Sequence, residues 1–238
     1  MPLPDYQALR YDAIHTHEPQ WNAAATVLAA NIHDRKVGVA MLYIKKCEAP
    51  DLSDLGDHLL SQFVAKFFLD VLSLPKSASA SRLLTEYLMV TDKAVREYIA
   101  GRNTLIAYSS GGGNVGLIAE GLGRFETCIN SMMRAFRLLD KMFDHKENPA
   151  FDKARRQLIG NCKLSVAPVR DIVRHIAKDI VARNVAETDT AYLLAINQDG
   201  NQLDIGDHNL ALVEIADALR NLHNTGCELI DGPWNIEA

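Results

Sequence analysis

The stretch VRDIVRHIAKDI, residues 169–180, carries five polar side chains that could act together on a phosphate: Arg170, Asp171, Arg174, His175 and Lys178. On an α-helix each residue advances by about 100°, so Asp171 and His175 are neighbours one turn apart. The carboxylate can then accept from one imidazole nitrogen and raise the basicity of the other. Together with the cations, this pair offers the groups for metal-independent RNA cleavage, in which histidine moves a proton and arginine neutralises phosphate charge.

One helix supplies one histidine, whereas acid-base cleavage ordinarily uses two groups. A symmetric dimer that apposes two such faces would complete the site, so we expect a homodimer. The spacing Arg-x4-His also occurs in RYDAIH, at Arg10 and His15, which we interpret as a chance match because prolines flank it and no long helix precedes it. The alternative for the 169–180 face is an ordinary solvated helix surface without chemistry.

The pattern of apolar residues predicts a mostly helical chain that positions this face. We expect an all-α helical bundle with one small β-hairpin near residues 192–206, where Gln-Asp-Gly-Asn separates two short apolar runs. The expected helices span about 20–46, 54–74, 80–101, 117–143, 152–161, 168–185 and 210–225. Pro168 is expected to begin its helix, and Gly101 and Gly226 to end theirs.

Two apolar stripes are expected to form the core. The first contains Leu55, Leu59, Phe63, Phe67 and Val71; the second contains Phe125, Ile129, Met132, Met133, Phe136, Leu139 and Phe143. Three glycines at 111–113 lack the Lys-Ser/Thr of a phosphate-binding loop and are expected to be a connection. They are the best candidate boundary between an N-terminal helical region, residues 1–110, and a helical domain at 117–226. The sequence is compatible with two arrangements, in which residues 1–110 form their own domain or extend the same bundle.

The order of these elements resembles the HEPN family (higher eukaryotes and prokaryotes nucleotide-binding) over about residues 117–225. A long amphipathic helix is followed by a short one, a helix bearing R-D-x-x-x-H, a small hairpin and a final helix. The resemblance implies that Arg170, Asp171 and His175 are catalytic, and we add Arg174 and Lys178 as substrate-binding residues. It also implies a dimeric helical bundle that cleaves RNA without a metal or cofactor, as a toxin or phage-defence effector with an antitoxin protein as a further partner. The alternative is a non-catalytic HEPN-fold dimer that binds or scaffolds.

Composition argues against several other classes of protein. The net charge is −5, but residues 124–183 hold thirteen Lys/Arg against seven Asp/Glu, whereas residues 184–238 hold one Arg against ten acids. An anionic partner therefore fits the middle of the chain best. The four cysteines match no zinc spacing, and we expect free thiols in a cytoplasmic protein. We expect no targeting peptide, no membrane span, no calcium loop and no di-iron Glu-x-x-His pairs.

Overall fold

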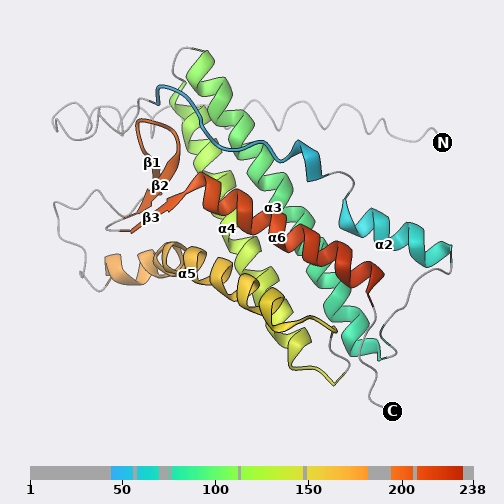
Figure 1. Ribbon diagram of the computed structural model, residues 1–238. Coiled ribbons are helices and arrows are strands. Elements are labelled where there is room, and N and C mark those ends of the chain that lie inside the picture. The colour runs from blue at the N-terminus through green and yellow to red at the C-terminus, as the bar shows by residue number, and fades with distance from the viewer. Residues whose placement is uncertain are drawn as a thin grey trace, which may run out of the picture. The chain divides into compact units, whose positions relative to one another are not determined.

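The computed structural model describes residues 44–55, 58–69, 75, 77–111, 114–146, 149–181, 194–205 and 208–232, with side chains on the last helix turns before residue 181 described as far as Ile172. All of these residues belong to one compact unit. The helices are η3 (Ser53–Leu55), α2 (Leu59–Phe68), α3 (Ala78–Ser110), α4 (Val115–Phe143), α5 (Lys153–Val181) and α6 (Leu212–Asp231). Strands β1 (Ala195–Ile196), β2 (Gln202–Ile205) and β3 (His208–Ala211) complete the fold (Figure 1). The expected helical bundle with a small hairpin is confirmed.

Helices α3 and α4 form a long antiparallel pair that other helices cross (Figure 1). Gly101 does not end a helix, as we had expected, because it lies inside α3 where α4 approaches closely. A Cβ at Gly101 would lie 3.1 Å from the carbonyl oxygen of Gly121, and a Cβ at Gly121 would lie 2.8 Å from Leu105. The glycines therefore serve the contact between helices rather than helix termination. Residues 111–113, where we predicted a boundary, stand in the chain between α3 and α4, and these two helices pack against each other.

Helix α6 continues to Asp231 through Gly226, where the sequence pattern had predicted its end. A Cβ at Gly226 would lie 2.5 Å from Leu59, the first residue of α2, so the absence of a side chain allows α2 to contact α6. The N-terminus of α2 is held by Asp92 of α3. The Asp92 carboxylate accepts from the backbone N–H groups of Leu59 at 2.9 Å and Leu60 at 3.0 Å, which satisfies donors that a helix start leaves unpaired.

The small sheet has the order β1-β2-β3, with both pairs antiparallel, and the predicted Gln-Asp-Gly-Asn turn connects β1 and β2. Gly200 in this turn has φ +70°, a conformation that favours glycine. The third strand was not predicted: we had expected the closing helix to begin near residue 210, but residues 208–211 pair with β2 and Ala211 is the N-cap.

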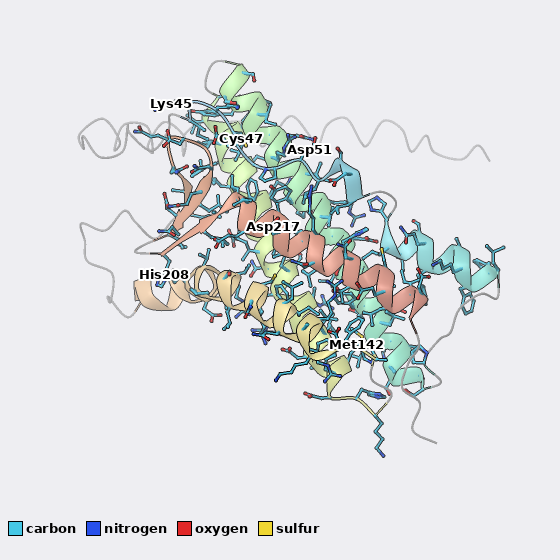
Figure 2. The ribbon with its side chains drawn as sticks, in the orientation of Figure 1. Lys45, Cys47, Asp51, Met142, His208 and Asp217 are labelled. Atoms are coloured by element: carbon cyan, nitrogen blue, oxygen red, sulfur yellow. The ribbon has the colours of Figure 1, made fainter. Side chains whose placement is uncertain are left out.

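The predicted helix over residues 20–46 does not extend to Lys46, because residues 44–46 and the residues that follow as far as Leu52 are not helical. Lys45 donates its backbone N–H to Gln198 and Glu48 donates to Gly200, so the segment uses its hydrogen bonds on the hairpin turn. Figure 2 shows Lys45 and Cys47 above the sheet on this segment. Residues 1–43 and most of the predicted 20–46 helix lie outside the described residues.

The core confirms the second predicted apolar stripe almost completely. Phe125, Ile129, Met132, Met133, Phe136 and Leu139 are buried, and Phe143 is half-buried. The first stripe is confirmed only in part: Leu59 is buried and Leu55 and Phe63 are half-buried, but Phe67 is 55% exposed, and Val71 lies outside the described residues. Helix α2 is short and rests on the bundle mainly through its first turn, whereas α4 lies in the middle of the bundle and buries a full side.

Candidate functional site on helix α5

Helix α5 is one continuous helix from Lys153 to Val181, with Pro168 inside it. We had predicted two helices with Pro168 beginning the second, and this was wrong. Proline has no N–H to offer the carbonyl of Leu164, four residues earlier, so one hydrogen bond of the helix is lost. Leu164 is 72% exposed, which leaves water to solvate this part of the helix. Packing of α5 against α4, α6 and the strands β2 and β3 holds the helix together across the proline.

Arg170 lies on the buried side of α5, not on the polar face where the sequence pattern had placed it. It is 8% exposed as a residue, beside Val166 and Val169, which are buried. Its Nη1 donates to Oδ1 of Asp171 at 2.5 Å, and the Asp171 side chain is 60% exposed. The buried side of α5 therefore includes Arg170, whereas Ile172, which the apolar pattern placed on that side, is only half-buried. A guanidinium in this position needs its carboxylate partner, since burial of an unpaired charge is costly.

Arg174, His175 and Lys178 lie on the last turns of α5, and their side chains are outside the described part of the structure. The structure therefore brings together Arg170 and Asp171 among the five residues predicted for the site. Figure 2 shows His208, the first residue of β3, at the end of the sheet that lies against α5.

The outward side of α5 carries a continuous row of uncharged side chains, which we call the α5 stripe. The α5 stripe consists of Gln157, Leu158, Asn161, Leu164, Ser165 and Pro168, all exposed. Leu158 is 40% exposed and Leu164 is 72% exposed. Spacings of three and four residues put these side chains on one side of the helix, and Asp171 continues the row toward the C-terminal turns. Exposed leucines in an uncharged row are typical of a contact surface.

Two cations beside the α5 stripe, Arg155 and Lys163, are paired within the chain. Arg155 makes a two-point contact with Glu228 of α6, at 2.5 Å from Nη2 to Oε1 and 3.2 Å from Nε to Oε2. Lys163 donates to Asp140 of α4 at 2.6 Å. These pairs tie α5 to its neighbouring helices and leave its middle section electrically neutral. Any anion-binding capacity of α5 therefore lies at the two ends of the helix.

All four cysteines are free, as we had expected: Cys47, Cys128, Cys162 and Cys227. Burial raises the pKa of each thiol above its ordinary value. The active form of a cysteine nucleophile is the thiolate, so a raised pKa argues against a catalytic role for these thiols. Cys162 lies on α5, where its sulfur accepts from the Asn221 amide at 3.5 Å.

Two further pairs of polar side chains were not predicted: one joins residues from different elements, and the other lies within α6. The Ser79 hydroxyl at the start of α3 lies 2.9 Å from Nε2 of His145, which follows α4. His223 and Cys227, one turn apart on α6, are separated by 3.9 Å between Nδ1 and Sγ. In the part of the chain that the structure describes, no group of three or more His, Cys, Asp or Glu side chains is placed to hold a metal ion.

Comparisons of the chain with protein-family models, with curated proteins and with solved structures gave no match. Among the described helices, none combines the length and the apolar character that a membrane crossing requires.

Proposed function

We propose that this protein is a metal-independent RNA endonuclease of the HEPN type, whose composite site forms where the C-terminal turns of α5 from two copies meet. The observation that carries the proposal is the state of Asp171, which is exposed and yet held at one oxygen by the buried Arg170. An ionised carboxylate accepts through both oxygens. With Oδ1 occupied by Arg170, Oδ2 remains for the imidazole of His175, one turn further along α5.

This arrangement divides the chemistry among the five residues. Arg170 orients Asp171, and Asp171 fixes the tautomer of His175 and raises the basicity of its other nitrogen. His175 takes the proton of the RNA 2′-hydroxyl, whose oxygen then attacks the adjacent phosphorus. The 5′-oxygen leaves and receives a proton from the His175 of the second copy. Arg174 and Lys178 neutralise the phosphate, and the products carry a 2′,3′-cyclic phosphate and a 5′-hydroxyl.

The α5 stripe supports the homodimer in this proposal. Asn161, Pro168 and His175 are spaced by seven residues, so a helix puts them close to one side, and a partner that covers the stripe also approaches His175. The point at which the two copies of α5 cross is constrained by the helix rise of about 1.5 Å per residue. Two antiparallel copies that cross at Leu164 would hold the His175 backbones about 33 Å apart, whereas a crossing at Asp171 reduces this to about 12 Å. The nuclease therefore requires a crossing within about one turn of Asp171.

An RNA cleavage assay in EDTA tests the proposal. Wild-type protein is expected to cut single-stranded RNA and to leave 2′,3′-cyclic phosphate ends. His175→Ala is expected to lower the rate by about 10²–10⁴-fold, the usual contribution of a proton-transfer group, while circular dichroism stays unchanged. His15→Ala is the matched control, because His15 belongs to the second Arg-x4-His spacing and is expected to be dispensable. Cleavage that survives His175→Ala would overturn the assignment.

A non-catalytic helical dimer is the second candidate, and the burial of Arg170 favours it. The guanidinium already donates to Asp171 and is 10% exposed at the side chain, so it serves the fold of the monomer. This candidate predicts a dimer that Leu164→Asp separates, with no cleavage by the wild type. Light scattering and the cleavage assay on the same samples distinguish the two: a dimer without activity supports the binding protein, and a dimer with His175-dependent activity supports the nuclease.

A further inference from the structure

Exposed cations gather at the end of the bundle where α4 ends and α5 begins, and we call this group the basic end. It consists of Arg82, Arg137, Lys141, Lys146, Lys153 and Arg156. The neighbouring contacts show that they come from adjacent elements. Ser79 of α3 contacts His145 after α4, Glu86 of α3 pairs with Arg134 of α4 at 2.6 Å, and Phe143 contacts Phe151 before α5. Met142, labelled in Figure 2, marks this end of α4.

Most other cations in the described part of the chain are paired with a carboxylate. The cations of the basic end have no ion pair with a described residue. Arg102, Arg124, Arg134, Arg155, Lys163 and Arg220 each lie within 4.0 Å of a carboxylate. No such contact occurs between the six cations of the basic end and the described carboxylates. Two exposed carboxylates lie among them, Asp144 and Asp152, and Asp152 is engaged with the backbone N–H of Arg155. The surface therefore carries an excess of positive charge that the fold does not use.

Helix ends add to this positive potential. The N-terminus of α3, at the basic end, has no acidic residue in its first turn, whereas at the start of α5 the carboxylate of Asp152 accepts from the backbone N–H of Arg155 at 2.7 Å. A helix N-terminus carries about half a positive charge, which aspartate or glutamate commonly offsets. At the start of α5 the Asp152 carboxylate offsets this charge, but Lys153, the first residue of the helix, and Arg156, the fourth, are two cations in the same turn. The six cations outnumber the two exposed carboxylates at this end, and the remaining positive potential favours a bound anion.

Aromatic rings lie directly beside the cations. The Arg156 guanidinium is 4.9 Å from the centre of the Phe143 ring, and the Phe143 and Phe151 rings meet edge to face at 5.8 Å. Phe151 lines an open cavity of about 300 Å³ together with Pro149, Leu229, Glu228 and Asp231, and the two acidic residues are paired with Arg155 and Lys66. Because both carboxylates are paired, the cavity lining carries no net charge, and a neutral nucleobase fits it better than a phosphate. Unpaired cations next to an aromatic wall are typical of surfaces that bind single-stranded nucleic acid.

We propose that the basic end binds single-stranded RNA, with the cations on its phosphates and a base beside Phe151. This inference rests on the proposed RNA substrate and adds where the strand enters. His175 is twenty-two residues from Lys153 on the same helix. At about 1.5 Å per residue this is about 33 Å along α5, so a strand of several nucleotides can span from the basic end to the proposed cleavage site. The uncharged middle of α5 contributes little to the affinity for the RNA strand.

Fluorescence anisotropy with a labelled 12-nucleotide single-stranded RNA tests the proposal on the full chain carrying His175→Ala. The triple variant R137E/K141E/R156E is expected to weaken binding at least tenfold and to lower the slope of log affinity against log salt by about 2, since each phosphate contact on a single strand contributes about 0.7. Phe151→Leu keeps an apolar side chain and is expected to weaken single-strand binding severalfold, because a stacked base is lost. The matched control, K45E/K46E, reverses two exposed lysines far from the basic end and is expected to change little.

Unchanged affinity in R137E/K141E/R156E would overturn the proposal, as would equal loss in the K45E/K46E control. Equal affinity for the RNA and for a duplex of the same length would also overturn it, because a duplex cannot stack a base on Phe151. Cleavage by the corresponding His175-containing proteins is measured separately. RNA binding that depends on the basic end, without cleavage, supports the binding proposal and contradicts the nuclease proposal. Cleavage together with unchanged binding by the triple variant supports the nuclease proposal and contradicts the binding proposal.

Discussion

The Arg170 guanidinium donates to Asp171 at 2.5 Å, and the two partners differ sharply in environment: the arginine side chain is 10% exposed and the aspartate 60%. The pair therefore joins the inside of the bundle to its surface. If the arginine loses its partner, a charge is left in the protein interior. If the aspartate loses its partner, the carboxylate is solvated by water.

Substitutions at this pair should therefore have unequal effects on stability. Asp171→Ala leaves a buried guanidinium without its acceptor and is expected to lower the free energy of unfolding by about 1–3 kcal/mol. Arg170→Met retains apolar contacts and leaves an exposed carboxylate, so the loss should stay below about 1 kcal/mol. Urea denaturation followed by circular dichroism measures both. Equal losses would mean that Arg170 stabilises the fold by packing alone.

Two glycines of α4 provide a matched test of the contact between α3 and α4. A Cβ at Gly121 would lie 2.8 Å from Leu105, which is buried, whereas a Cβ at Gly123 would have nothing within 4 Å. Gly121→Ala is expected to destabilise by about 1–3 kcal/mol because the core is overpacked. Gly123→Ala is expected to stabilise by about 0.5–1 kcal/mol because alanine is the better helix former. Thermal denaturation gives both signs, and a stabilised Gly121→Ala would show that the helices can separate without cost.

The carboxylate of Asp92 should hold the start of α2. Asp92→Ala removes the acceptor for two backbone N–H groups and is expected to cost about 1–2 kcal/mol, as for a lost N-cap. Hydrogen exchange should become faster at Leu59 and Leu60 before it changes in α4. Asp51→Ala is the control, because Asp51 accepts from Ser53 in an exposed turn and should have a smaller effect. Unchanged exchange at Leu59 would exclude a capping role for Asp92.

Alkaline pH should destabilise the fold through groups whose pKa burial raises. These are the thiols of Cys47, Cys128, Cys162 and Cys227 and the phenols of Tyr87 and Tyr98. An unfolded chain releases the proton of a thiol above its ordinary pKa of about 8.5, whereas the folded chain keeps that proton. The stabilisation is therefore complete below that pH and is lost as pH rises.

Cys128 is the most informative of these groups, because it is fully buried. Between about pH 9.5 and 10.5 its proton should contribute about 1.4 kcal/mol per pH unit to the fall in the free energy of unfolding. Cys128→Ala should remove that contribution and leave a shallower dependence on pH, in addition to a loss of stability that is constant with pH. Urea titrations at several pH values measure both slopes. Parallel curves for the variant and the wild type would contradict the raised pKa.

The periodicity of single segments was enough to predict α4, its buried Phe and Met side chains, and the β1–β2 turn. Those features depend on contacts that a local pattern reports, since a helix that buries one full side must repeat apolar residues every three or four positions. Prediction failed where a residue type has two uses. Gly101 and Gly226 were expected to end helices, but they lie inside helices where a neighbouring side chain or backbone requires the space of a missing Cβ.

The sequence by itself determined the helical bundle, the free cysteines and the presence of Arg170, Asp171 and His175 on adjacent turns, because each follows from local spacing and residue type. Only the tertiary structure decided that α5 continues through Pro168, that Arg170 lies inside the bundle, and that cations from three helices converge at one end. Burial of a given helix face and the meeting of distant segments depend on which elements pack together. That choice is made by the sum of many weak contacts across the whole chain, so no single segment carries it.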